Sequence, residues 1–251
     1  MAILQSDALV LRASKLGETS KIVTLLSRAH GKLRAVAKGA RAPRSRYQSS
    51  LEPLSEVRVS LYGRQGTELF RLGACELLHS AYPLATRGLE QGLAVSYFAE
   101  LLDAFASDGV AEDPVYRLAQ AVLAAAEQGG PLPLLTRYFE AWLLRLHGIY
   151  PQLERCASCN GALPEGPLAY HRPAHGFACA ACRPATGPFL PEDGRAALRE
   201  IFRLGPSELS PALAGALAGL EAFHQDLIGA HLERNLRSQR VLAEVRRDLR
   251  H

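Results

Sequence analysis

Four of the chain's five cysteines stand in two pairs whose spacing is typical of a metal site. Cys156 and Cys159 have two residues between them, nineteen residues follow, and Cys179 and Cys182 repeat the spacing. Each pair can fold as a tight turn that presents two thiolates, and two such turns supply the four sulfur ligands of a tetrahedral zinc site. The sequence therefore predicts one structural zinc ion per chain, held by these four cysteines.

The residues around the cysteines argue against a catalytic zinc, and a zinc hydrolase is the less favoured alternative. A catalytic zinc keeps one coordination position open, and zinc deaminases combine P-C-x-x-C with H-x-E. Here Arg155 and Ala178 precede the two pairs, and neither His171 nor His175 begins an H-x-E, although either could replace a cysteine ligand by spacing. The chain also has no GxxxxGK[ST] phosphate loop and no acidic cluster of nuclease type. We therefore expect a protein that is not an enzyme.

The most one-sided charge of the chain lies in residues 27–50, which hold seven Lys or Arg and no acidic residue. The period of a strand puts one set of cations on a single face, and a loop with Gly and Pro adds a second set. Together they are Lys32, Arg34, Lys38, Arg41, Arg44 and Arg46. Such a strip suits the phosphates of nucleic acid, and these six residues are the predicted nucleic-acid contacts. A second candidate stripe recurs at every fourth residue of a predicted helix: Arg195, Arg199 and Arg203.

The cations of the first strip belong to a region with the period of strands. Apolar residues alternate in five short runs separated by turn signals, at 7–13, 20–27, 31–39, 54–63 and 67–78. Five short strands favour a small barrel, and among five-stranded forms we expect an OB-type barrel, although the strand count alone does not establish it. OB barrels bind single strands in a basic groove with aromatic stacking platforms. Tyr47, Tyr62 and Phe70 could each stack on a base or pack within the barrel, and the sequence alone leaves both open.

The period changes to that of helices beyond Pro83. Apolar stripes predict helices over about 87–107, 115–122, 135–146, 191–204 and 213–227. The Pro- and Gly-rich cysteine segment interrupts them at about 152–190, as a zinc-ribbon-like module. We therefore predict an OB-fold nucleic-acid-binding domain at 1–80 and a helical domain at 81–251 that carries the module.

The charge follows the same boundary. Residues 1–80 hold four Lys and nine Arg against six acidic residues, a net charge of +7, whereas residues 81–251 hold sixteen Arg against nineteen, a net charge of −3. No apolar run approaches the roughly 18 to 20 residues of a membrane span, and the N-terminus lacks the pattern of a signal peptide. We expect a cytoplasmic protein without a membrane partner.

Several phrases of the sequence resemble the bacterial RecO family of DNA repair proteins. They are ALVLRASKLGETSKIVTLLSRAHGK, VAKGARAPRSRYQSSLEPL, the two C-x2-C pairs and the closing HLERNLRSQRVL. Ala42 departs from the family, which commonly has another basic residue there. The resemblance implies a nucleoid-associated recombination mediator that binds single- and double-stranded DNA and anneals complementary strands without ATP. It further implies that the protein acts with RecR to help RecA displace single-stranded DNA-binding protein.

An RNA-binding protein is the main alternative within the binding class. A basic OB surface contacts the backbone charge of either polymer, and only contacts to the 2′-hydroxyl distinguish RNA from DNA. The residues themselves therefore leave open a zinc-braced RNA-binding factor.

Overall fold

The computed structural model describes residues 2–64 and 66–232, together with residues 236, 238, 241, 242 and 245. The chain divides into two compact units, Met1–Arg117 with Leu236–His251 and Leu118–Asn235, and each unit is described by itself. Much of the closing phrase HLERNLRSQRVL lies outside the described residues. Within these residues, no helix combines the length and the apolar character needed to cross a membrane.

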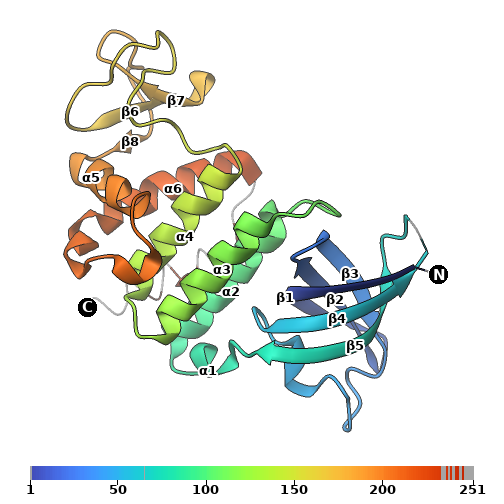
Figure 1. Cartoon of the computed structure of the whole chain (residues 1–251). Helices are drawn as coiled ribbons and strands as arrows, with labels where there is room; N and C mark the ends of the chain where they lie inside the picture. Colours follow the sequence, from blue (N-terminus) through green and yellow to red (C-terminus); the bar gives the residue numbers. More distant parts are fainter. Residues whose placement is uncertain are drawn as a thin grey trace. The chain divides into compact units, whose positions relative to one another are not determined.

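The first unit contains the predicted five-stranded barrel (Figure 1). Its strands are β1 (Ala2–Leu16), β2 (Ser20–Ser27), β3 (Gly31–Ala37), β4 (Glu56–Gly63) and β5 (Phe70–His79). The barrel closes in the order β1-β2-β3-β5-β4; β3 and β5 run parallel, and the other neighbours run antiparallel. The long strand β1 pairs with β4 through its first half and with β2 through its second half. This architecture is OB-like and confirms the predicted fold class.

Alternating side chains fill the barrel, as the period of two in the sequence predicts. On β3, Leu33, Ala35 and Ala37 are buried inside, whereas Arg34 is exposed on the outer face. The short 3-10 helix η1 (Gln48–Leu51) and the residue before it complete the interior. The core side chains are Ala8, Val10, Val23, Leu25, Leu33, Ala35, Ala37, Tyr47, Leu51, Val57, Val59, Leu61 and Leu72.

A helix covers part of the outer face of the barrel. After the short α1 (Tyr82–Ala85), the helix α2 (Leu89–Phe105) packs against β1 and β2. Outward-facing residues such as Leu9, Leu11 and Leu26 are buried because α2 lies on them. The outer face is therefore divided into a part that α2 covers and a part that is open.

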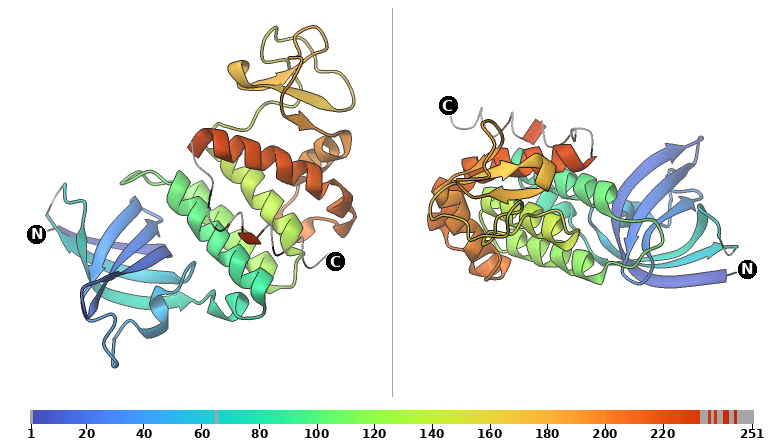
Figure 2. Two further views of the ribbon diagram at one scale, coloured as in Figure 1. Left: turned by 180° about the vertical axis from the view of Figure 1, so that it is seen from behind. Right: turned by 90° about the horizontal axis from the view of Figure 1, so that it is seen from above.

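The second unit contains the helices α4 (Leu132–Leu146), α5 (Glu192–Ile201) and α6 (Leu217–Leu232). It also holds the 3-10 helices η3 (Pro206–Glu208) and η4 (Pro211–Ala216), and the boundary between the two units falls within α3 (Asp113–Glu127). Between α4 and α5 lies the cysteine module, with η2 (Arg172–Ala174) and a small sheet of β6 (Leu168–His171), β7 (Gly176–Ala178) and β8 (Phe189–Leu190) in the order β7-β6-β8. Both views of Figure 2 show this sheet beside α5 and α6.

Aromatic packing joins the cysteine module to the helices of the second unit. The ring of Phe177 stacks on that of Phe223, with centroids 5.3 Å apart, and Tyr170 and Tyr150 meet Phe223 edge to face. The module therefore shares a core with α6 and does not depend on a metal alone for its position.

The predicted helices are present with small differences in their ends. The stripe at 213–227 begins as 3-10 helix η4 and becomes α6 at Leu217. The barrel strands end at His79, close to the predicted boundary at residue 80, while the first compact unit continues through α1 and α2.

Candidate functional site

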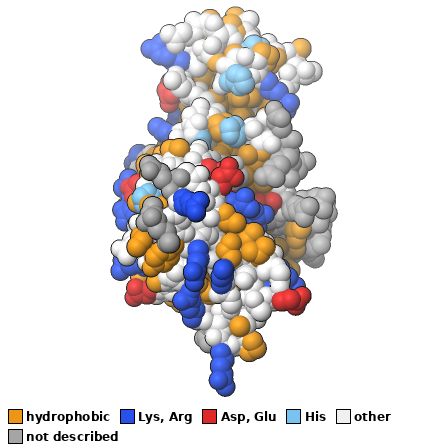
Figure 3. Space-filling view, turned by 90° about the vertical axis from the view of Figure 1, so that its right-hand side faces the viewer, with side chains coloured by type: hydrophobic (Ala, Val, Ile, Leu, Met, Phe, Trp, Pro, Cys, Tyr) orange, Lys and Arg blue, Asp and Glu red, His pale blue; other side chains and the backbone are white. Residues whose placement is uncertain are grey.

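The open part of the barrel's outer face carries two of the predicted DNA contacts. Arg34 and Lys38 are exposed, and no described residue forms a hydrogen bond or ion pair with either side chain. Both follow from the strand period, because Leu33, Ala35 and Ala37 occupy the barrel interior. In Figure 3, Lys and Arg side chains gather together with apolar ones on the surface of the barrel.

Lys32 faces outward as predicted but is held by protein groups. Its Nζ donates to the carbonyl of Asp103 at 2.8 Å and lies 3.8 Å from the carboxylate of Asp108, and the side chain is only 17% exposed. The backbone of Lys32 also exchanges hydrogen bonds with the segment after α2, at Ser107 and Gly109. Lys32 therefore fastens this segment to β3, and the open cationic strip begins at Arg34.

The loop after β3 carries three predicted contacts, and two of them are positioned by hydrogen bonds. Arg41 donates to the carbonyl of Gly17 at 2.7 Å, which places it beside the β1–β2 turn. Arg46 donates to the hydroxyl of Tyr47 at 2.7 Å, and its guanidinium lies 4.9 Å from the centroid of that ring. Arg44 is exposed, and the described residues give it no hydrogen bond or ion pair. All three remain accessible to a ligand.

Arg71 is a further cation of this surface that the sequence analysis missed. It stands opposite Val36 in the parallel pairing of β3 with β5, between Arg34 and Lys38 along the neighbouring strand. It is exposed, and no described residue pairs with it. The period of two in residues 67–78 could have placed it outward, but only the pairing of β5 with β3 puts it beside the strip.

The predicted stripe on the helix near residue 195 is not continuous. Arg195 is 5% exposed and turned toward the interior, whereas Arg199 and Arg203 are exposed. Arg195 and Arg199 are one turn apart on α5, but the cysteine module covers Arg195, and α5 ends at Ile201, before Arg203. Arg203 lies beyond that end and pairs with Glu200 at 2.6 Å.

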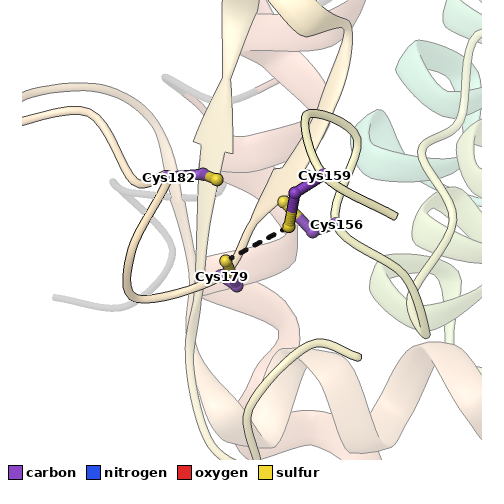
Figure 4. Close-up of side chains that lie close together, drawn as sticks. All are labelled: Cys156, Cys159, Cys179 and Cys182. Atoms are coloured by element: carbon purple, nitrogen blue, oxygen red, sulfur yellow. Dashed lines mark hydrogen bonds between the residues drawn. The ribbon is translucent and has the colours of Figure 1, made fainter. Parts of the chain in front are cut away.

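The four predicted zinc ligands converge at one point (Figure 4). All four sulfur atoms lie within 4.8 Å of one another, and the sulfurs of Cys159 and Cys179 are 3.7 Å apart. A tetrahedron with zinc–sulfur bonds of about 2.3 Å has an edge of about 3.8 Å, which this distance matches. The cluster could hold a metal ion with sulfur ligands only.

The first cysteine pair forms a tight turn fixed by backbone hydrogen bonds. The N–H of Cys156 donates to the carbonyl of Gly161 at 2.8 Å, and Asn160, in a left-handed conformation, donates back to the carbonyl of Cys156 at 2.9 Å. The N–H of Ala157 donates to the carbonyl of Phe177 in β7. The turn packs so closely on the hairpin that a Cβ at Gly176 would lie 2.5 Å from the Cβ of Ala157, so glycine is needed at this position. The turn therefore rests directly on the β6–β7 hairpin.

Backbone N–H groups aimed at sulfur favour the thiolate that a metal requires. Hydrogen bonds from the backbone of Cys179, and then of Cys159 and Ser158, lower the pKa of Cys156 to about 6. The pKa of Cys182 is raised to about 12 by hydrogen bonds with the neighbouring cysteine side chains, first that of Cys179. A divalent cation would supply the positive charge that this crowded set lacks, so the donor set fits a metal.

No histidine belongs to the cluster among the described residues. His171 instead lies 3.3 Å from the hydroxyl of Ser158 through Nδ1, and His175 is exposed in the turn after η2. If all four sulfurs bind one metal ion, they complete a tetrahedral shell and leave no position for water or substrate, which argues against the zinc-hydrolase alternative.

Arg195 fastens the cysteine module to α5. Its guanidinium donates to the carbonyl of Leu153, before the first pair, at 2.8 Å and to that of Pro164, between the pairs, at 2.5 Å. The buried arginine thus bridges the two ends of the loop that carries Cys156 and Cys159. This structural contact was not apparent in the sequence, where Arg195 resembled a surface residue.

Comparison with known proteins gives two family matches that together cover most of the chain. Residues 1–81 match the family described as "Recombination protein O N terminal", and residues 88–240 match "Recombination protein O C terminal". Similar proteins include the DNA repair protein RecO of Koribacter versatilis, 35% identical over 92% of this chain and 95% of its own length. Those of Anaeromyxobacter sp. strain K and Geobacter metallireducens are 34% and 32% identical over 94% and 97% of this chain, and over 94% and 98% of their own lengths.

Proposed function

The chain belongs to the RecO family of DNA repair proteins, and from that premise we propose that it is a recombination mediator with no catalytic activity of its own. It binds single- and double-stranded DNA through their phosphates and anneals complementary strands without ATP. Together with RecR, it helps RecA to load on strands covered by single-stranded DNA-binding protein. Acting on the chromosome, it would work at the nucleoid in the cytoplasm.

One observation carries the DNA-binding part of this proposal. Arg34, Lys38, Arg44 and Arg71 are exposed cations for which the described residues offer no hydrogen-bond or ion-pair partner. By contrast, Arg28 and Arg58 of the same unit pair with aspartates. Cations that no acidic residue neutralises create a positive potential that attracts phosphates and releases their counterions.

Annealing follows from the same charge. Two complementary strands repel each other through their phosphates, and a cationic surface that neutralises both lowers this barrier. Base pairing then supplies the free energy, so that no nucleotide hydrolysis is needed. The mechanism needs neither base-specific contacts nor a catalytic centre.

We assign the metal a structural role and zinc as its identity. Four thiolates in tetrahedral arrangement are typical of structural zinc sites, which contribute folding free energy to small modules. The metal would be held by Cys156, Cys159, Cys179 and Cys182, and would join the first turn to the second across the β6–β7 hairpin.

The experiment compares two triple variants of the full chain. Arg34→Ala, Lys38→Ala and Arg44→Ala together remove three unpaired cations; Arg28→Ala, Arg58→Ala and Arg117→Ala remove three that already pair with aspartates. On single strands, log K changes by about 0.7 per phosphate contact for each decade of salt. If each residue holds one phosphate, the first variant should lose about two units of slope and anneal more slowly.

Equal slopes and annealing rates for wild type and the first variant would refute the proposed path. The control variant should stay close to wild type, since its cations are already neutralised. A binding competition between DNA and RNA oligonucleotides of matched sequence tests whether the protein prefers RNA. A clear preference for RNA would point to contacts with the 2′-hydroxyl and favour an RNA-binding factor.

A further inference from the structure

The structure separates the three aromatic residues of the barrel that could contact a base. Tyr47 is 2% exposed, belongs to the core and donates its hydroxyl to the carbonyl of Leu72 at 3.0 Å. Phe70 stands opposite Ala35 and packs against the barrel core. Tyr62 follows the buried Leu61, so the strand period turns it to the outer face, where it is partly exposed. Of the three, only Tyr62 is placed to meet a ligand.

The ring of Tyr62 rests on the backbone of the neighbouring strand. A Cβ at Gly73 of β5 would lie 2.1 Å from Cε2 and 2.8 Å from Cδ2 of this ring. Only glycine leaves the room that the ring occupies, and the backbone beneath it fixes the ring's position. None of the described residues stacks on Tyr62 or bonds its hydroxyl. The ring is therefore positioned but has no partner, unlike an aromatic residue of the core.

Cations lie next to this ring in the direction of β5 and β3. Tyr62 is paired with Arg71 across β4 and β5, and Arg71 is paired in turn with Val36, which lies between the strip residues Arg34 and Lys38. A phosphate next to a base at Tyr62 would thus meet Arg71, with Arg34 and Lys38 one strand further along the sheet.

In the opposite direction along β4 and β5, acidic residues disfavour the binding of phosphates. A shallow cavity of about 360 Å³ lies there, next to Ser60, and its lining includes the carboxylates of Asp7 and Glu76. Only Arg58 adds a positive charge, and it pairs with Asp7 at 2.8 Å. A bound strand would therefore run from Tyr62 toward β3 and not along β4.

We propose that Tyr62, supported by Gly73 and flanked by Arg71, is the platform on which a base of single-stranded DNA stacks. This inference rests on the proposed DNA-binding function and adds to it a basis for distinguishing single strands from duplexes. In a duplex the bases are already stacked and paired, so only the phosphates reach the surface. A free base presents its face, and stacking on an aromatic ring tolerates any sequence.

The test measures binding of the full chain to an oligo(dT) strand and to a hairpin duplex over a range of salt. Tyr62→Ala should weaken single-strand binding about tenfold, leave duplex binding within about twofold, and keep the salt slope, since no cation is lost. Tyr62→Leu should weaken single-strand binding by a similar factor. Its side chain still covers the backbone at Gly73, so this variant separates loss of the aromatic ring from a folding defect. Tyr62→Phe should bind as wild type does, because the ring is retained.

Two further variants sharpen the result. Gly73→Ala should displace the ring and reproduce the loss, while Tyr82→Ala removes a tyrosine that is 54% exposed in α1 and should change nothing. Single-strand binding by Tyr62→Ala and Tyr62→Leu at the wild-type level, with a normal salt slope, would overturn the platform but leave the cationic strip intact. A wild-type protein that binds neither ligand in a salt-dependent way would overturn the proposed function itself, and the platform with it.

Discussion

Arg195 offers the sharpest test of how the cysteine module is held, because Arg199, its neighbour in the predicted stripe, provides the control. In Arg195→Ala the guanidinium that bridges Leu153 and Pro164 is lost. Arg199→Ala removes the same side chain one turn later, from an exposed position where no described residue pairs with it. Both variants lose one positive charge from the same helix, so that only the hydrogen bonds differ.

The expected magnitude follows from the contacts. A hydrogen bond from a charged donor contributes about 1.5 to 3 kcal/mol, and Arg195 makes two short ones, of which that to Leu153 is buried. Its own Nε is buried and has no hydrogen-bond partner among the described residues, which offsets part of this gain. We therefore expect Arg195→Ala to lower the free energy of unfolding of the second unit by about 2 to 4 kcal/mol. Arg199→Ala should stay within about 0.5 kcal/mol of wild type.

The chain's single tryptophan provides a local probe for this measurement. Trp142 donates its indole N–H to the carbonyl of Ile201, the last residue of α5, at 3.0 Å. Urea unfolding followed by tryptophan fluorescence therefore reports on the helix that carries Arg195, and a chelator assay reports how fast the metal leaves. If the two variants unfold at the same urea concentration and release metal equally fast, Arg195 does not fasten the module.

Three further predictions concern the metal, a buried histidine and a close backbone approach. Cys179→Ser should abolish zinc binding measured by elemental analysis under reducing conditions, and a wild-type protein purified without metal would contradict the assignment. Burial lowers the pKa of His224 below its unfolded value of about 6.5, so the unfolded chain takes up the proton first. The contribution of His224 to stability should thus be constant above about pH 6.5 and decrease below it, so stability should fall less in His224→Gln as the pH is lowered; equal urea midpoint shifts in the two proteins would argue against this. Gly31→Ala puts a Cβ 1.9 Å from the carbonyl oxygen of Val110 and should lower the free energy of unfolding measured by calorimetry by about 2 kcal/mol or more. Gly39 has a similar positive φ but open space around it, so Gly39→Ala should lower it less; equal losses would mean that the close approach is unimportant.

The sequence predicted the local geometry of both candidate sites well. The C-x2-C spacing pointed to the four sulfurs that the structure brings together, because two cysteines separated by two residues fit one tight turn wherever the turn lies. The alternation on residues 31–39 likewise predicted which side chains of β3 face outward. Both inferences depend on residues close in sequence, and backbone geometry alone determines them.

The sequence determined the barrel, the helices and the types of residue in the two candidate sites, and the tertiary structure decided which of these residues are accessible. Lys32 and Arg34 are equivalent in the strand pattern, yet Lys32 is held by Asp103 and Asp108 because α2 covers that end of the face. Arg195 and Arg199 are one helical turn apart, and only the packing of the cysteine module buries the first. Tyr62 differs from Tyr47 and Phe70 through its place against Gly73. In each case the deciding neighbour is at least ten residues away in the chain, and only the assembled fold brings it into contact.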